Sequence, residues 1–182
     1  LFGDSDDREY ETDFPGLGRI FPHPYGAVDD KYFTTRLTLS PAGDELTLDF
    51  AKALLDNEQL GQDDVPDYLA ISFSSTDYVG HLFGASSLES EDNLARLDRT
   101  LADLLAYVDK KVGLANTLIV LSADHGQPEV PGHLHEHGNE NAQHFDTNSL
   151  DKTPAIAALK KQFGIGETLI EAFFQPYVYL NR

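Results

Sequence analysis

The sequence contains no cysteine, no methionine and no tryptophan, and it is poor in basic residues. Without cysteine the chain has no disulfide, no thiolate metal site and no cysteine nucleophile. Its 13 lysine and arginine residues face 31 aspartate and glutamate residues, so the formal net charge is −18. A field this negative argues against nucleic acid and anionic membrane surfaces as partners. No hydrophobic run is long enough to predict a membrane span.

The missing methionine also bears on the ends of the chain. Because the sequence starts at Leu1, we expect either a processed protein or an internal part of a longer one. Its 182 residues suit one domain with a substantial core. We therefore expect residues 1–182 to form a single partial domain, central to C-terminal in a larger protein.

Hydrophobic periodicity and turn residues predict the order of elements along the chain. Asp44 is a candidate N-cap for the first predicted helix, and Ser87 or Ser90 for the second. The hydrophobic stripes expected to face the core are Leu46, Phe50, Ala53, Leu54 and Leu60 in the first helix and Leu94, Leu97, Leu101, Leu104, Leu105 and Val108 in the second. The predicted elements are a strand at 33–39, helix 45–60, strand 67–73, helix 90–111, strand 117–121, helix 154–163, helix 167–173 and strand 177–180.

Two short hydrophobic segments, residues 67–73 and 117–121, flank the predicted helix at 90–111. This order is typical of a βαβ unit, whose right-handed crossover brings both strands into one sheet in parallel. We therefore predict an α/β fold with a mostly parallel sheet flanked by helices. The carboxyl ends of parallel strands share one edge, where open α/β sheets bind ligands.

Each of these two segments is followed by an aspartate and a histidine. Asp77 and His81 follow the first, and Asp124 and His125 follow the second. Two carboxylates and two imidazoles in one crevice suit a divalent ion of the zinc type. The pairs can serve one ion, or two ions roughly 4 Å apart that clamp the oxygens of a phosphoryl transfer. Either motif alone is common by chance, so the prediction depends on their shared position.

The same segments resemble the alkaline phosphatase superfamily, most closely the PafA-type alkaline phosphatases, which are relatives of the nucleotide pyrophosphatase/phosphodiesterases. The resemblance spans most of the chain and is weakest over residues 127–150. The matching stretches are Arg-Ile-Phe-Pro-His at 19–23, Ser-Ser-Thr-Asp-Tyr-Val-Gly-His at 74–81 and Leu-Ser-Ala-Asp-His-Gly at 121–126.

The resemblance implies an alkaline-phosphatase-like α/β/α sandwich and a two-zinc hydrolase of phosphate monoesters with a covalent phospho-enzyme. Asp77 and His81 match ligands of one Zn²⁺, and Asp124 and His125 match ligands of the other. The family's nucleophile and remaining ligands match no position here. We therefore expect no catalytic nucleophile in this chain, and we expect the rest of its own polypeptide to complete the site. The implied substrate is a small-molecule phosphate ester, and the implied location is periplasmic or secreted.

Sister activities within the superfamily stay open, because they share the metal motifs and differ in nucleophile and substrate contacts. They are phosphodiesterase or nucleotide pyrophosphatase, sulfatase, and cofactor-independent phosphoglycerate mutase. The diesterase branch usually has Pro-Asp where this chain has Thr76-Asp77, which favours the monoesterase.

Residues 127–150 are expected to form an irregular, histidine-rich loop, and they offer a different class of function. His133, His135, His137 and His144 allow an acidic, histidine-rich metal-binding module without catalysis. Histidine-rich tracts are only a compositional hint of metal binding, so we favour a solvated loop.

Other polar residues receive structural roles. His23 is expected to stabilise a turn. Ser74, Ser75 and Thr76 are expected to orient Asp77 through hydrogen bonds. The acidic residues expected on a solvated helix face are Glu89, Glu91, Asp92 and Asp98.

Overall fold

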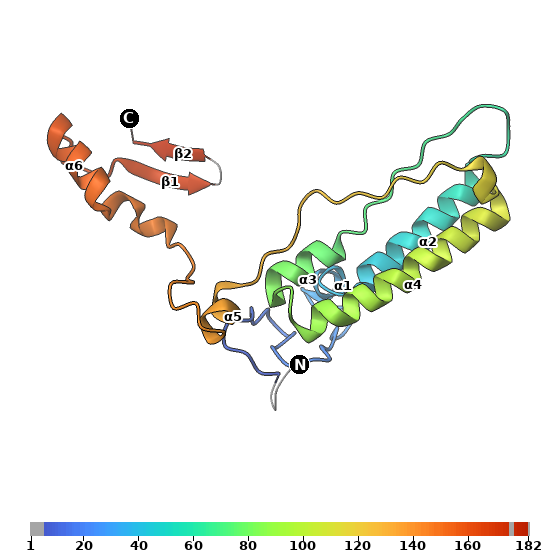
Figure 1. Ribbon diagram of the computed structural model, residues 1–182, viewed down its shortest axis with the longest axis horizontal. Helices are drawn as coiled ribbons and strands as arrows, with labels where there is room; N and C mark the ends of the chain where they lie inside the picture. The colour runs from blue at the N-terminus through green and yellow to red at the C-terminus, as the bar shows by residue number, and fades with distance from the viewer. Residues whose placement is uncertain (1–5, 175–176, 182) are drawn as a thin grey trace. The chain divides into compact units, whose positions relative to one another are not determined.

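The computed structural model describes residues 6–174 and 177–181 (Figure 1). Its contacts divide the chain into two units, Leu1–Asn141 and Ala142–Arg182. None of the helices in the described part combines the length and the hydrophobicity needed to cross a membrane. The helices of the first unit are α1 Phe33–Thr38, α2 Pro41–Asn57, α3 Ser75–Phe83, α4 Leu88–Lys111, the 3₁₀ turn η1 Leu114–Asn116 and α5 Pro131–Glu136.

Helices α2 and α4 form a long pair, and α1 and α3 pack near one end of it (Figure 1). Local sequence signals set the ends of both long helices. Pro41 occupies the first turn of α2, where its missing N–H is not needed. The Ser87 side chain accepts a hydrogen bond from the Ser90 amide at 3.1 Å, which confirms Ser87 as the N-cap of α4. Gly113 follows the C-cap Val112 with a φ of 90°, a backbone conformation that favours glycine.

The buried face of α2 is not the predicted one. Leu48, Ala51 and Leu55 are buried, whereas Phe50 is 71% exposed and Leu46 is also exposed. Asp44 does not cap α2 but lies inside its first turn, buried.

The leucine stripe of α4 is likewise less buried than predicted. Leu94 and Leu105 are exposed, and Leu97, Leu101, Leu104 and Val108 are only partly buried. The buried residues of α4 are instead mostly polar, namely Glu89, Ser90, Asn93 and Thr100. The prediction of a solvated Glu89 is therefore wrong.

The predicted strand at 33–39 is helix α1 instead. Tertiary contacts explain the difference. The buried Arg36 side chain of α1 binds to the loop that precedes the helix. The Arg36 guanidinium donates hydrogen bonds to the carbonyls of Pro15 (2.9 Å) and Tyr25 (2.8 Å) and pairs with Asp30 at 2.8 Å. These contacts outweigh the β-propensity of the aromatic and β-branched residues in this segment.

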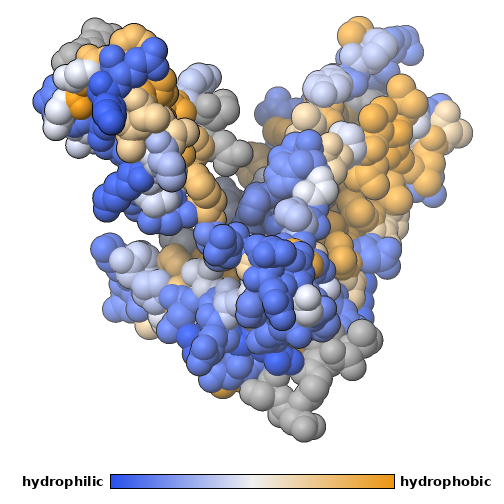
Figure 2. All heavy atoms as spheres, turned by 60° about the vertical axis from the view of Figure 1, so that its left-hand side comes forward, coloured by the Kyte–Doolittle hydropathy of each residue, from blue (hydrophilic) through white to orange (hydrophobic). Residues whose placement is uncertain are grey.

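The two segments predicted as parallel strands, 67–73 and 117–121, belong to no sheet in the described part of the chain. Their backbone is irregular, and many of their large hydrophobic side chains are exposed. Tyr68 is 91% exposed and Leu118 is 90% exposed. Figure 2 shows large hydrophobic areas open on the surface of the molecule. Among the described residues, no other element packs over the exposed hydrophobic side chains of these two segments.

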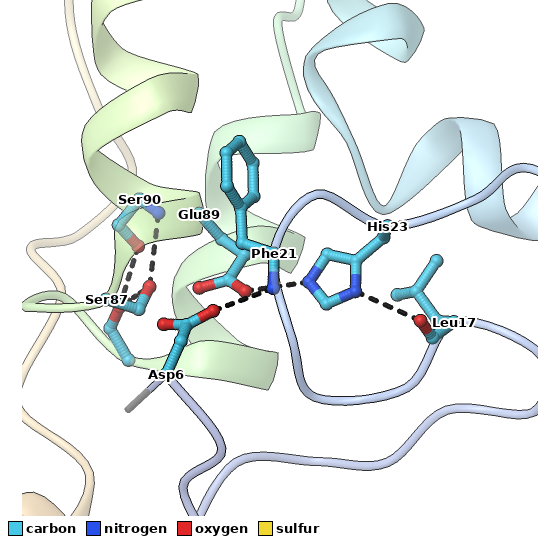
Figure 3. Close-up of polar contacts among 8 residues, drawn as sticks. Asp6, Leu17, Phe21, His23, Ser87, Glu89 and Ser90 are labelled. Atoms are coloured by element: carbon cyan, nitrogen blue, oxygen red, sulfur yellow. Dashed lines mark hydrogen bonds and ion pairs between the residues drawn. The ribbon is translucent and has the colours of Figure 1, made fainter. Parts of the chain in front are cut away.

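The N-terminal segment is anchored to α4 through His23 (Figure 3). His23 Nε2 lies 2.7 Å from Glu89 Oε1, and Nδ1 lies 3.1 Å from the Leu17 carbonyl oxygen. Both partners only accept, so the imidazole donates from both nitrogens. Burial opposes this, but the hydrogen bond to Glu89 dominates among the remaining causes and raises the pKa of His23. A hydrogen bond from the Phe21 amide to Asp6 (2.7 Å) fixes the same segment. The structural role predicted for His23 is confirmed.

Glu11 lies buried beside this network, and its Oε2 has no hydrogen-bond partner in the described residues. Burial, followed by repulsion from the Glu89 carboxylate, raises the pKa of Glu11 to about 8. A carboxyl group with a raised folded-state pKa binds more protons in the folded than in the unfolded state between these two pKa values. The stability that Glu11 contributes is therefore fully present below about pH 4.5. It falls as the pH rises and is lost above about pH 8, where the buried carboxyl group is ionised.

We expect Glu11→Gln, which mimics the protonated acid, to remove this pH dependence. At pH 9 the variant should be more stable than the wild type by about 2 kcal/mol, while at pH 4.5 the two should be alike. Urea denaturation followed by circular dichroism at both pH values measures the difference. The exposed Glu9→Gln is the matched control and should leave the pH dependence unchanged. Equal stabilities of Glu11→Gln and wild type at pH 9 would contradict the assignment.

The second unit contains η2 Thr147–Lys152, α6 Pro154–Phe163 and an antiparallel hairpin of β1 Ile170–Phe174 and β2 Tyr177–Leu180. Helix α6 begins at Pro154 and ends before Gly164 (φ 68°), as predicted, and its Leu159 is exposed. The strand at 177–180 is confirmed. The predicted helix at 167–173 is wrong, because most of that segment pairs with β2 as β1.

Candidate metal centre

Helix α3 begins directly after the extended segment 67–73 and carries two of the four predicted ligands. Asp77 and His81 are separated by one helical turn, so they project from the same face. The opposite face carries Val79 and Phe83, which are buried in a cluster with Leu17. Hydrophobic packing thus fixes the rotation of α3 and turns the aspartate and histidine outward. No helix was predicted here. The pattern did contain a signal for one: Asp77 and His81 are four residues apart, and so are the hydrophobic Val79 and Phe83, which places each pair on its own helix face.

The structure brings His125 to this pair from a distant part of the sequence. Asp77 Oδ1 lies 3.1 Å from His81 Nε2 and 3.2 Å from His125 Nε2. The two imidazole ring centres are 5.7 Å apart. One ligand-type atom from each of the three residues lies within 4.8 Å of the other two, and this is the only such group of three in the described residues.

The contacts at Asp77 fit a cation better than a hydrogen-bonded network. Asp77 Oδ1 is buried and lies within 3.2 Å of both imidazole nitrogens, yet neither contact has the geometry of a hydrogen bond. A buried carboxylate oxygen without a donor is costly. One carboxylate and two imidazoles are donors that Zn²⁺ binds readily. The three residues therefore have the chemistry and the proximity to hold a divalent metal ion.

His125 is already oriented for such a role. Its Nδ1 lies 3.0 Å from the carbonyl oxygen of Gly126, so Nδ1 carries the proton and Nε2 faces Asp77. A carbonyl that fixes the far nitrogen is the usual support of a metal-binding histidine. The Gly126 carbonyl, then the Asp124 and Asp77 carboxylates, raise the pKa of His125.

Asp124 lies next to this group but not in it. Its side chain is 81% exposed, and its Oδ2 is 3.5 Å from His125 Nε2. The structure thus brings three of the four predicted ligands together and leaves the fourth beside them.

Ser74, Ser75 and Thr76 form hydrogen bonds with other residues than Asp77, their predicted partner. The Ser75 amide donates to Asp44, Thr76 Oγ1 accepts from Asn93, and Ser74 Oγ pairs with Ser72 Oγ. No direct hydrogen bond from these hydroxyls to Asp77 occurs among the described contacts, so the prediction that they orient it directly is wrong. No local sequence pattern indicated that Asp44 and Asn93 contact the start of α3.

The histidine-rich segment is more ordered than predicted. His133 and His135 lie on helix α5, and His137 is its C-cap. The rings of His133 and His137 stack with centres 4.1 Å apart, and His137 Nδ1 lies 2.8 Å from the His133 carbonyl oxygen. None of these histidines belongs to a three-donor group in the described part of the chain.

Comparison with known families agrees with this arrangement. The family model described as type I phosphodiesterase / nucleotide pyrophosphatase matches residues 8–171. The chain belongs to this family. The match includes the candidate metal centre and both extended segments that lead to it.

Two curated relatives and one solved structure show which branch is similar. The chain is 40% identical over 162 residues to alkaline phosphatase PafA of Elizabethkingia meningoseptica, covering 89% of this chain and 29% of that protein. It is 39% identical over 180 residues to a protein of Myroides odoratus named calcium-transporting ATPase, covering 97% of this chain and 32% of the relative. The crystal structure of wild-type PafA superposes with a TM-score of 0.79 at 38% identity, covering 98% of this chain and 33% of that one.

These coverages have a direct consequence. The chain spans about a third of the length of the curated relatives it matches. Its fold is accordingly similar to part of an alkaline phosphatase, namely a helix-rich part that carries a candidate metal centre.

Proposed function

We propose that the chain is part of a longer metal-dependent phosphoric ester hydrolase, and that the intact enzyme is a phosphomonoesterase of the two-zinc alkaline phosphatase type. The observation that carries the proposal is the meeting of Asp77, His81 and His125 within 4.8 Å. A buried carboxylate oxygen of Asp77 lies within 3.2 Å of both imidazole nitrogens and makes no hydrogen bond among the described residues. The family match and the similarity to PafA support the class of reaction. A periplasmic or secreted location, implied by the same similarity, belongs to the proposal.

In the proposed enzyme this chain supplies metal ligands rather than the nucleophile. Asp77, His81 and His125 would hold Zn²⁺, which when bound stabilises the negative charge that develops on phosphoryl oxygens. The Gly126 carbonyl keeps the His125 proton on Nδ1 and leaves Nε2 for the metal. Asp124, beside His125, is assigned to the second ion on the family resemblance. The nucleophile and the remaining ligands come from the rest of the polypeptide.

The proposal also extends to the sheet. In the longer polypeptide, segments 67–73 and 117–121 would join a mostly parallel sheet flanked by helices. Two observations support this part of the proposal: many of their hydrophobic side chains are exposed, and proposed metal ligands follow each segment within a few residues.

A phosphodiesterase or nucleotide pyrophosphatase is the second candidate, because the matching family model bears that description. Comparison of p-nitrophenyl phosphate with bis-p-nitrophenyl phosphate as substrates of the full-length gene product separates the two. The monoesterase proposal expects the higher kcat/KM for p-nitrophenyl phosphate. A preference for the diester would transfer the assignment to the second candidate.

We expect the 182-residue chain to bind Zn²⁺ through Asp77, and Asp77→Asn to weaken the affinity by about 10-fold to 100-fold. The substitution removes the negative charge of the only carboxylate in the three-donor group. Competition with a colorimetric zinc chelator measures the dissociation constant. Asp98→Asn, on the exposed face of α4, removes the same charge elsewhere and should leave the affinity unchanged.

The same titration tests the histidine-rich alternative. The triple variant His133→Ala/His135→Ala/His137→Ala should retain the zinc site of the wild type. Loss of the tightest site in the triple variant, with Asp77→Asn unaffected, would support the metal-binding module without catalysis instead.

A further inference from the structure

Two buried polar side chains, each from a different helix, form hydrogen bonds with the two residues of α3 that precede Asp77. On one side is Asp44 of α2, which is 2% exposed. Its Oδ1 accepts a hydrogen bond from the Ser75 amide at 3.0 Å. The residue at the N-cap position of α3, Ser74, makes no side-chain cap hydrogen bond. Asp44 therefore provides from a neighbouring helix the capping that α3 lacks in its own sequence.

On the other side is Asn93 of α4, which is 1% exposed. Its Nδ2 donates a hydrogen bond to Thr76 Oγ1 at 2.8 Å. Because Thr76 is the residue immediately before Asp77, this bond restrains the backbone at the ligand. The Oδ1 atom of this buried amide has no hydrogen-bond partner among the described residues, so the contact of Nδ2 with Thr76 is the hydrogen bond that offsets the burial of the group.

The close approach of α2 to α3 indicates that this contact is tight. A Cβ atom added to Gly43 would clash with Ser75 Oγ, so glycine at this position lets α2 approach the Ser75 side chain closely. Gly43 directly precedes Asp44, and it places the Asp44 carboxylate within reach of the N-terminus of α3.

We infer that Asp44 and Asn93 are positioning residues for the metal centre: they hold the first turn of α3 so that Asp77 stays in register with His81 and His125. The inference rests on the proposed function, since it assigns a role in metal binding. His81 lies a full turn further along α3, beyond the part that these two side chains restrain. Loss of either contact lets the first turn fray, which displaces Asp77 relative to the two histidines.

The test is a double-mutant cycle on zinc affinity in the 182-residue chain. Asp44→Ala should weaken Zn²⁺ binding about 10-fold, as supporting residues around metal ligands commonly do. Asp44→Asn, which keeps one acceptor oxygen, should restore part of the loss. In an Asp77→Asn background Asp44→Ala should have little further effect, because the residue acts through Asp77. A purely structural role would weaken binding equally in both backgrounds.

A second variant and a matched control keep the test independent of folding. Thr76→Val removes the acceptor of the Asn93 amide at nearly constant volume and should also weaken binding several-fold. The control is Asp49→Ala, at an exposed position of α2, the helix that carries Asp44; it should bind Zn²⁺ like the wild type. Circular dichroism checks the helical content of each variant.

The outcomes separate this inference from the proposed function. If the wild type binds Zn²⁺ through Asp77 but Asp44→Ala and Thr76→Val bind like Asp49→Ala, the positioning role is overturned and the metal site stands. If Asp77→Asn binds Zn²⁺ as tightly as the wild type, the proposed metal centre fails, and this inference fails with it.

Discussion

Replacing His81 with alanine in the full-length gene product is expected to lower kcat/KM for p-nitrophenyl phosphate by about 10³-fold, which corresponds to roughly 4 kcal/mol of transition-state stabilisation. His81 Nε2 lies 3.1 Å from Asp77 Oδ1, and with His125 the two residues form the proposed zinc-binding set of three donors. Loss of one imidazole removes a ligand of the ion and shifts the charge that faces the substrate. Steady-state kinetics at saturating Zn²⁺ measures the effect.

His135→Ala is the matched control for this prediction. His135 is an exposed histidine on α5 and belongs to no three-donor group in the described residues, so its replacement should leave kcat/KM within about twofold of the wild type. Asp124→Ala should lose activity to a similar extent as His81→Ala, because the proposal assigns Asp124 to the second ion. An Asp124→Ala enzyme with full activity would reduce the proposed site to one metal ion.

The candidate site could be predicted from the sequence because its residues follow two similar hydrophobic segments. Asp77, His81 and His125 were identified from their chemistry and position, and the structure brings them together. Helix α3 could not be predicted from propensity, since its nine residues include a glycine and β-branched residues. It forms because Val79 and Phe83 pack into the cluster with Leu17, which lies far away in the sequence.

The supporting residues were beyond sequence reasoning for a similar reason. Asp44 and Asn93 are 31 and 17 residues away from their partners on α3. The local sequence marked Asp44 as a cap of its own helix and did not distinguish Asn93 from a solvated helix residue. Their burial follows from the packing of α2, α3 and α4. The same holds for Glu89, whose contact with His23 spans 66 residues.

The fold was predicted least well where hydrophobic side chains stay exposed in the described part of the chain. Phe50, Leu94 and Leu118 are typical of buried positions, yet all three are exposed. A hydrophobic pattern indicates which residues are buried in the entire folded protein. This chain spans about a third of the length of two relatives that it matches. In the proposed longer polypeptide these residues would face segments that this chain does not supply.

The isolated 182-residue chain is expected to hydrolyse p-nitrophenyl phosphate no faster than buffer, even with added Zn²⁺, whereas the full-length gene product turns it over. The described residues provide one group of three metal donors, and Asp124 remains 81% exposed beside it. One partly ligated ion cannot stabilise both the attacking and the leaving oxygen, which two-metal catalysis requires. The resemblance also places the nucleophile outside this chain, so the covalent step has no acceptor for the phosphoryl group.

Release of p-nitrophenol tests this prediction. It is followed over hours with the isolated chain, with the full-length gene product and with a buffer blank. The isolated chain should match the blank at every Zn²⁺ concentration, and treatment of the full-length protein with a chelator should bring it down to the same level. Zinc-dependent turnover by the isolated chain would mean that it contains a complete site. In that case the variant His133→Ala/His137→Ala would show whether the stacked histidine pair at the end of α5 supplies the missing donors.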